Sequence, residues 1–350
     1  MTTETSITNS NISKADLNPG FLVIAIGGAG KESVKSAKKH YQAAGRPFAM
    51  YTVVIDTDAR GFDAFDLAIN ISPTRQKLSA MDANPEKYGP ACKALVKHHR
   101  SLLKSEAIGH GSRMTRIITQ VAFELFHEQI INDLRHAIHS LIEQGQPRIL
   151  PVVIASFGGG TGSAGIILLQ DFFTDDVIKR KITFGLQYDM VARPVSFAID
   201  GFAHANQQRN EANRRRILAN IYSTRVELAE YEKADKGYQY CFHLGLGNDA
   251  GAIFPTIEQV CEANGVICCE WMANYDIFKS HAVNDLDFCI DTSPYTGNDI
   301  PELHGYPREL IPEYGERIDE VTTEEELIDE KTYDKDETDT KSTELDGKKE

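Results

Sequence analysis

Gly158-Gly159-Gly160-Thr161-Gly162-Ser163 is the stretch of sequence that decides the fold. It follows the apolar run from Val152 to Phe157 and precedes the apolar helical stretch from Ala164 to Phe173. A strand, a glycine-rich turn and a helix in this order are typical of a phosphate-binding loop. Consecutive glycines let backbone N–H groups approach anionic oxygens, and the helix directs its positive end at them. We therefore predict a phosphate-binding turn, to which Thr161 and Ser163 add hydroxyl donors.

A second glycine cluster follows another apolar strand near the start of the chain. Phe21 to Ile26 is continuously apolar and ends in Gly27-Gly28-Ala29-Gly30, after which we expect a helix from Lys31 onward. A P-loop would need a glycine five residues before Gly30 and a Ser or Thr after the lysine. Ala25 and Glu32 occupy those positions, so this motif does not fit.

The same cluster leaves a dinucleotide-binding interpretation open. That fingerprint would use Gly28 and Gly30, with Asp56 after the second strand holding a ribose, but its third position is Ser33 rather than Gly or Ala. The corresponding function is a NAD-dependent oxidoreductase. It is the minority alternative, because the later glycine-rich stretch has no role in it.

Four motifs in order along the chain resemble those of the tubulin/FtsZ superfamily. The stretch from Gly158 to Ser163 is similar to its signature, and Gly27 to Gly30 is similar to its first loop. The second strand, Met50 to Ile55, ends in Asp56-Thr57-Asp58-Ala59, which resembles the FtsZ turn Asn-Thr-Asp-Ala. Ala83-Asn84-Pro85-Glu86 is similar to the loop that faces the terminal phosphate. The chain thus resembles a short, divergent, prokaryotic tubulin-like protein.

The resemblance implies a bound guanine nucleotide, GTP or GDP, with Mg²⁺ held through the phosphates. The two glycine loops, the turn from Asp56 to Asp58, and Asn84 would contact the phosphates. Arg209 matches an arginine of the loop that contacts ribose and phosphate, although Ala205 replaces the glutamate of that loop. Asn264 matches the guanine-reading residue of the central helix, and a side-chain amide suits a purine edge because it has donors and an acceptor.

The resemblance also implies which acids would catalyse GTP hydrolysis. Asp287 lies 23 positions after Asn264, as in the family's catalytic loop, whose carboxylates position water on the nucleotide of the neighbouring subunit. The second acid should fall at Ile290, and the nearest acids are Asp285 and Asp291. We expect a protein that self-associates and whose GTPase activity depends on that assembly. A non-hydrolysing, nucleotide-gated adaptor or scaffold with an unidentified protein partner is the alternative.

Composition divides the chain into four regions. Residues 1–18 are polar and expected to be disordered, and the resemblance implies that 19–290 form a tubulin/FtsZ-like GTP-binding domain. Residues 291–318 form a short extension, and 319–350, with 14 acids against 5 lysines, form an acidic disordered tail. The superfamily's usual second domain is therefore expected to be missing or vestigial. The predicted fold class is α/β, a doubly wound, mostly parallel sheet with the nucleotide loops at the strands' carboxyl ends.

Composition also limits the partners. The chain has 350 residues and a net charge of −14, which argues against nucleic acid as a partner. No stretch reaches transmembrane length, and residues 1–18 lack the apolar core of a signal peptide, so we expect a cytoplasmic protein without membrane insertion. The six cysteines show no metal-binding spacing and are expected to be core thiols.

Three further elements follow from apolar periodicity. Apolar residues from Ile117 to Ile142 repeat at three and four positions, which predicts a helical insert that ends at Gly145. A strand is expected from Ile182 to Tyr188, after the glycine-rich signature. A helix that closes the sheet is expected from about Pro255 to Ser280.

Overall fold

The computed structural model describes residues 19–46, 48–104, 112, 114–245, 256–275 and 290–291. The predicted N-terminal segment 1–18, the extension after residue 291 and the acidic tail 319–350 lie outside these residues. The candidate catalytic residues Asp285 and Asp287 also lie outside them. Those assignments therefore stay predictions.

The described strands form one sheet in the order β3-β2-β1-β4-β5-β6-β7. The first six run parallel, and β7 pairs antiparallel with β6. Their bounds are β1 Gly20–Ile26, β2 Met50–Asp56, β3 Leu67–Asn70, β4 Ile149–Ser156, β5 Val195–Ile199, β6 Tyr240–Leu244 and β7 Ile290–Asp291. β1 and β4 are buried at every residue, as continuous apolar runs in a covered parallel sheet should be. The predicted α/β class with a doubly wound, mostly parallel sheet is confirmed.

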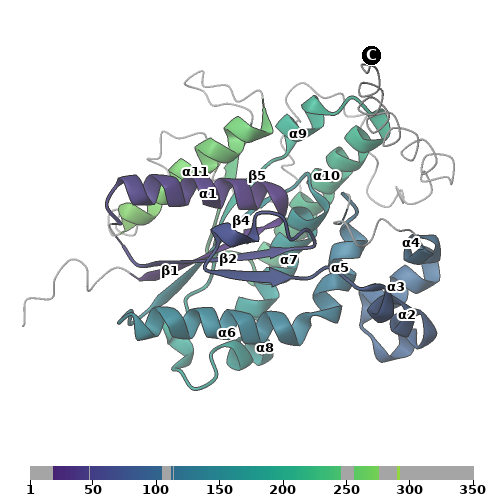
Figure 1. Cartoon of the computed structure of the whole chain (residues 1–350), viewed down its shortest axis with the longest axis horizontal. Coiled ribbons are helices and arrows are strands. Elements are labelled where there is room, and N and C mark those ends of the chain that lie inside the picture. Colours follow the sequence, from purple (N-terminus) through teal and green to yellow (C-terminus); the bar gives the residue numbers. More distant parts are fainter. Residues whose placement is uncertain are drawn as a thin grey trace, which may run out of the picture. The chain divides into compact units, whose positions relative to one another are not determined.

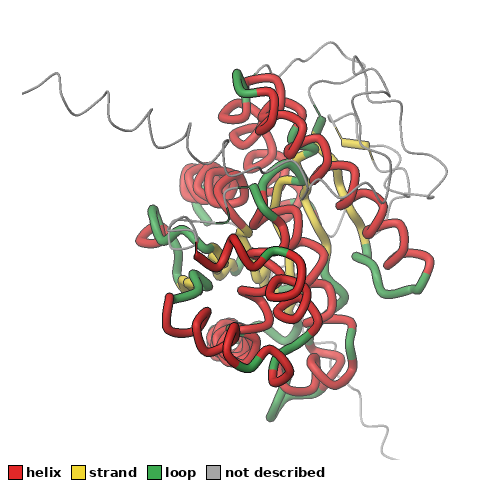
Figure 2. Tube along the Cα trace, turned by 90° about the vertical axis from the view of Figure 1, so that its right-hand side faces the viewer, coloured by secondary structure: helices red, strands yellow, loops and turns green. Residues whose placement is uncertain are grey.

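Helices cover both faces of the sheet (Figures 1 and 2). α1 and α11 lie side by side on one face, where Trp271 packs edge-on against Phe21 and Phe197. The other face packs against α6 and α7, with Leu22 and Ile24 in the core. The bounds are α1 Gly27–Ala43, α2 Arg75–Ala83, α3 Pro90–His98, α4 Arg100–Lys104, α5 Arg116–Leu125, α6 His127–Glu143, α7 Gly160–Thr174, α8 Asp176–Ile182, α9 Phe202–Gln207, α10 Glu211–Lys233 and α11 Ile257–Ala273, with 3-10 turns η2 Phe62–Ala64, η3 Pro85–Lys87 and η5 Tyr188–Met190.

The sheet reverses its winding direction between β1 and β4. The chain runs from β1 outward to β2 and β3, and then returns to place β4, β5 and β6 on the other side of β1. Ala25 of β1 is paired with Ile154 of β4, so both strands end at the same edge of the sheet. The loops that follow them flank the crevice at this switch point, which is where open α/β sheets bind their ligands.

The strand predicted from Ile182 to Tyr188 is wrong. Ile182 is the last residue of α8, Gly185 has a left-handed φ of 84°, and Tyr188 begins η5. Phe184 is 71% exposed, so this apolar side chain is not part of a buried strand. The fifth strand is β5, all five residues of which are buried.

The helical insert is two helices rather than one. α5 ends at Leu125, α6 begins at His127, and Phe126 between them has φ −112° and ψ 12°. Phe126 and Ile130 continue the apolar spacing of four positions across this point, so the sequence pattern does not mark the break. The break at the buried Phe126 lets α5 pack against α3 and α7 while α6 packs against the sheet.

Most of the predicted core thiols are in the core. Cys92, Cys261, Cys268 and Cys269 are buried and free, whereas Cys241 is only half-buried and Cys289 lies outside the described residues. The helices of the described chain include none with the length and apolarity that a membrane crossing requires.

Candidate functional site

Two helices begin at the switch point with free N-terminal ends. Both helices start on glycine, α1 directly after β1 and α7 separated from β4 by three residues, without a side-chain cap or an acid in the first turn. Four other helices have side-chain caps: α2, α8, α10 and α11, capped by Thr74, Asp175, Asn210 and Thr256. An uncapped N-terminus leaves backbone N–H groups and a partial positive charge available to an anion.

The two glycine turns touch each other. Gly27 has φ 70°, a left-handed conformation that glycine adopts readily, and a Cβ built on it would lie 3.0 Å from the Gly162 nitrogen. A Cβ on Gly162 would lie 2.6 Å from the Ser156 carbonyl oxygen, and one on Gly30 would overlap the Ile154 carbonyl. These three glycines are therefore required by packing.

Gly28 and Gly159 differ from the other glycines of the two loops. Gly28 is exposed, Gly159 is half-buried, and a Cβ built on either would meet nothing within 4 Å. By contrast, a Cβ on Gly158 would lie 2.9 Å from Ile217 Cγ2, and one on Gly160 would overlap the Ser112 hydroxyl. Ala29 is half-buried and packs under the turn against the cluster around Val260. Open backbone at the crevice is thus confined to one position in each loop.

The hydroxyls of the glycine-rich turn bond protein atoms, contrary to the expectation that they point at phosphate. Thr161 Oγ1 lies 3.1 Å from Thr57 Oγ1 and donates to Ser112 Oγ over 3.0 Å. Ser163 is fully buried, and its hydroxyl donates to the Gly160 carbonyl over 3.3 Å. In this structure both hydroxyls are therefore engaged within the protein.

The turn after β2 is anchored to α1 by a buried ion pair. Lys31 Nζ lies 2.8 Å from Asp56 Oδ2 and also donates to the carbonyls of Asp58 and Arg60. The other Asp56 oxygen accepts from the Thr57 N–H over 2.7 Å. Both carboxylate oxygens of Asp56 are thus engaged, and the residue is 3% exposed, which does not suit the ribose contact of the dinucleotide interpretation.

Asp58 closes the same turn on its exposed side. The Arg60 guanidinium donates to both Asp58 oxygens and lowers the pKa of that carboxyl. Asp58 therefore carries a full negative charge that is already paired within the loop, and its part in this structure is to shape the turn.

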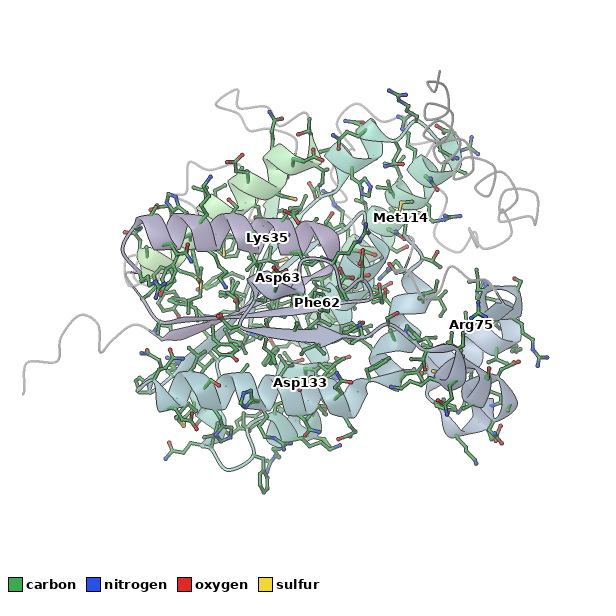
Figure 3. All side chains as sticks on the ribbon, in the orientation of Figure 1. Lys35, Phe62, Asp63, Arg75, Met114 and Asp133 are labelled. Atoms are coloured by element: carbon green, nitrogen blue, oxygen red, sulfur yellow. The ribbon has the colours of Figure 1, made fainter. Side chains whose placement is uncertain are left out.

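Two polar residues that sequence reasoning missed hold the glycine loop from the far side. Asn220, on α10 and 6% exposed, donates to the carbonyls of Met114 and Gly158 over 2.9 and 3.1 Å. Ser112 bonds Thr161, as described above, and Met114 is labelled in Figure 3. In the sequence, the one sign of this role is that Asn220 is a polar residue within the apolar stripe of α10.

Two predicted contacts lie in exposed turns. Asn84 is exposed between α2 and η3, in the helical group whose first residue, Arg75, is labelled in Figure 3. Its backbone hydrogen bonds all go to this segment. Arg209 is exposed between α9 and α10, two residues before α10 begins. The described contacts join neither residue to the glycine loops.

Asn264 lies inside the protein rather than at an open surface. It is 2% exposed on α11, and its Nδ2 donates to the Phe197 carbonyl of β5 over 3.4 Å. A Cβ on the next residue, Gly265, would overlap the Ser33 carbonyl, so α11 is pressed closely against α1. Close packing explains why the predicted base-reading amide is covered here.

Of the predicted acids, only Asp291 is described, and only through its backbone. It is paired with His243, one residue before the carboxyl end of β6. This is the edge of the sheet where β1 and β4 end, and β7 is three strands, about 14 Å, from β4. The resemblance implied acids that reach the neighbouring subunit, whereas Asp291 lies at the phosphate-loop edge of its own sheet.

No cluster of three or more histidine, cysteine or acidic side chains suited to a metal ion occurs in the part of the chain that the structure describes. The fold and the site define a doubly wound α/β protein in which two glycine turns meet at the switch point of the sheet.

No protein-family model matches the chain. No curated protein matches its sequence. Among solved structures, CetZ2 from Haloferax volcanii, a GTPgS-bound protofilament, is 11% identical with a TM-score of 0.43, over 73% of this chain and 58% of its own. CetZ from Methanosaeta thermophila is 11% identical with a TM-score of 0.41, over 77% and 57%. TubZ from Clostridium botulinum phage c-st is 12% identical with a TM-score of 0.39, over 74% and 59%. The chain thus spans less than three fifths of these proteins, and such identities do not assign a family.

Proposed function

We propose that the chain is a tubulin/FtsZ-like protein that binds GTP or GDP in the crevice between β1 and β4. The observation that carries the proposal is the meeting of two uncapped helix N-termini, each starting on glycine, at the switch point. An anion placed there receives two sets of backbone N–H groups and the positive ends of α1 and α7. A nucleotide polyphosphate is the ligand that this arrangement suits best.

Gly28 and Gly159 are the positions where the phosphates approach the backbone most closely. Among the glycines of the two loops, only these two have open space next to Cα, which phosphate oxygens can occupy. Mg²⁺ would be held through the phosphates, not by a set of protein ligands, and would offset their negative charge. The contacts between Thr57, Thr161 and Ser112 hold the glycine-rich turn against the turn after β2.

The contacts to the rest of the nucleotide belong to the same proposal. Asn84 and Arg209 are exposed and carry the polar groups that a terminal phosphate and a ribose need. Asn264 can contact guanine only if its side-chain amide breaks the hydrogen bond to the Phe197 carbonyl and bonds the base instead. A higher affinity for GTP than for ATP is the expected result of that contact.

We further propose self-association, with GTP hydrolysis at a subunit interface and Asp287, Asp285 and Asp291 as the candidate acids. The place of Asp291 at the phosphate-loop edge favours a second candidate arrangement, in which an acid of the same chain serves the site. A nucleotide-gated adaptor that binds GTP without turnover is the third arrangement. The GTPase rate per molecule rises with protein concentration in the first arrangement, is independent of it in the second, and is absent in the third.

Equilibrium binding of GTP, GDP, ATP and NAD to one preparation of the full chain tests the proposal. We expect GTP and GDP to bind, ATP to bind more weakly, and NAD to bind weakest. Preferential binding of NAD would overturn the proposal in favour of the dinucleotide interpretation. For the adaptor, binding of a partner must differ between the GTP-bound, GDP-bound and empty states, because a ligand shifts an equilibrium only through differential affinity.

A further inference from the structure

A cluster of ionisable side chains lies outside the glycine-lined crevice, on adjacent strands β5 and β6. Ser196 is in register with Cys241, and Ala198 is in register with His243. Because side chains alternate along a strand, Ser196, Cys241 and His243 lie on one face of the sheet. Asp200 follows β5 directly and reaches the same cluster.

The contacts in this cluster run in one line from a thiol to a guanidinium. Cys241 Sγ lies 3.0 Å from His243 Nε2, and His243 Nδ1 lies 3.7 Å from Asp200 Oδ1. The same Asp200 oxygen accepts from Arg225 Nη2 over 2.7 Å. An activated cysteine nucleophile needs a histidine that can hold the proton of the thiol. It also needs a carboxylate that orients the histidine.

The sulfur has a second polar neighbour and is the accessible end of the line. Ser196 Oγ lies 2.9 Å from Cys241 Sγ, so a thiolate there would accept hydrogen bonds from both a hydroxyl and an imidazole. His243 is 1% exposed and Asp200 is 8% exposed, whereas Cys241 is half-buried. Cys241 is therefore the most exposed residue of the cluster.

The histidine is the group that carries the proton at neutral pH. Burial by itself lowers the pKa of His243, but the neighbouring Cys241 sulfur and Asp200 carboxylate outweigh burial and raise that pKa to about 9. The other titratable groups that face the cluster are Arg225 and Tyr238. The Tyr238 hydroxyl donates to the Ile166 carbonyl over 2.6 Å, so it is occupied elsewhere.

We propose that Cys241, in contact with His243, is a reactive thiol and a site of oxidation by hydrogen peroxide. The sulfur attacks one peroxide oxygen and the O–O bond breaks. The leaving hydroxide takes the proton that Cys241 and His243 share and departs as water. The sulfur is oxidised to a sulfenic acid while the peroxide is reduced. This inference does not depend on nucleotide binding.

The other described cysteines provide an internal reference. Cys92, Cys261, Cys268 and Cys269 are buried, and burial raises the pKa of Cys261 to about 12 and that of Cys269 to about 11. They stay protonated at neutral pH and are shielded from reagents. The reactivity of Cys241 can therefore be compared with that of the buried cysteines in the same protein sample.

The first experiment measures the alkylation rate of each cysteine in the native full chain. Iodoacetamide labelling from about pH 6 to pH 9, read by peptide mass, should show Cys241 reacting on the order of tenfold faster than the four buried cysteines at neutral pH. Its rate should change little over this range. An ordinary thiol loses about tenfold in thiolate per pH unit below pH 8.5, so such a fall at Cys241 would overturn the proposal.

The second experiment uses variants and peroxide. Dimedone, which traps sulfenic acids, should label Cys241 in the wild-type chain after brief peroxide treatment, and C269S should leave that label unchanged. C241S should abolish it, and H243Q should make alkylation of Cys241 pH-dependent and slow it on the order of tenfold at neutral pH. If H243Q does not fold, the wild-type pH profile decides. Peroxide treatment without a label on Cys241 contradicts the proposal.

Discussion

The hydroxyl oxygens of Thr57 and Thr161 lie 3.1 Å apart, although 104 positions separate the two residues in the chain. Thr57 is in the turn after β2, and Thr161 is in the first turn of α7. Both residues are buried, and Thr161 also donates to Ser112. This contact joins the turn after β2 to the glycine-rich turn, so it sets the shape of the crevice between them.

The pair should be energetically coupled. T57V and T161V each remove one hydroxyl with little change in volume, and each should lower the free energy of unfolding by about 1–3 kcal/mol because a buried partner is left unsatisfied. The double variant should lose less than the sum, with a coupling of about 1 kcal/mol. Urea unfolding of the four proteins measures the cycle. Strict additivity would show that the two hydroxyls do not interact.

The glycines at 159 and 162 should respond in opposite ways to the same substitution. G162A places a Cβ against the Ser156 carbonyl of β4, which cannot move away, so it should destabilise the fold by about 1–3 kcal/mol. G159A meets open space in an extended backbone with φ −79°, so its thermal midpoint should stay close to that of wild type. Calorimetry of both variants checks this. Equal stability of the two would contradict the packing assigned to Gly162.

His204 should make the fold less stable in mild acid. Burial lowers the pKa of this α9 side chain below its usual value of 6.5, although Glu258 opposes the shift. The unfolded chain then binds a proton at His204 that the folded chain does not, so the free energy of unfolding falls as the pH drops below 6.5. H204Q should reduce the loss measured by urea unfolding between about pH 7.5 and pH 5.5. His136 is exposed, so the control variant H136Q should lose as much free energy of unfolding as wild type over the same pH range.

The loops and strands nearest the crevice could be predicted from the sequence. β1, β2 and β4 are continuous apolar runs that end in glycine or in acid and hydroxyl residues, so local pattern alone marks their bounds. That Gly27 and Gly160 would lie at the same edge follows from the parallel sheet. The contact between their turns confirms it in the described chain.

The rest depends on tertiary contacts that a local pattern does not contain. The run from Ile182 to Tyr188 has a strand-like composition, yet it leaves Phe184 exposed while β5 fills the sheet. The amide of Asn264 has the polarity of a ligand group, but α11 packs it against the Phe197 carbonyl. Ser112 and Asn220 reach the glycine loop from distant parts of the chain, so neither could be assigned from spacing.

Turnover should distinguish a shared site from a self-contained one. If acids act across a subunit interface, the GTPase rate per molecule rises with protein concentration, and D287A loses turnover while it keeps GTP affinity. Mixing D287A with a Gly159 variant should then restore part of the activity, because one chain supplies the nucleotide site and the other supplies the acid. A rate that is independent of concentration, with no rescue on mixing of folded variants, favours an acid of the same chain such as Asp291.

The most direct test of the nucleotide site is the GTP affinity of G159V compared with that of wild type. The Gly159 side-chain position is open, so valine there should leave the fold intact and take up the space assigned to phosphate oxygens. We predict that GTP affinity falls at least tenfold, or about 1.4 kcal/mol, while the thermal midpoint of the nucleotide-free protein is unchanged. A folded G159V that binds GTP as tightly as wild type would contradict a phosphate site at the meeting of α1 and α7.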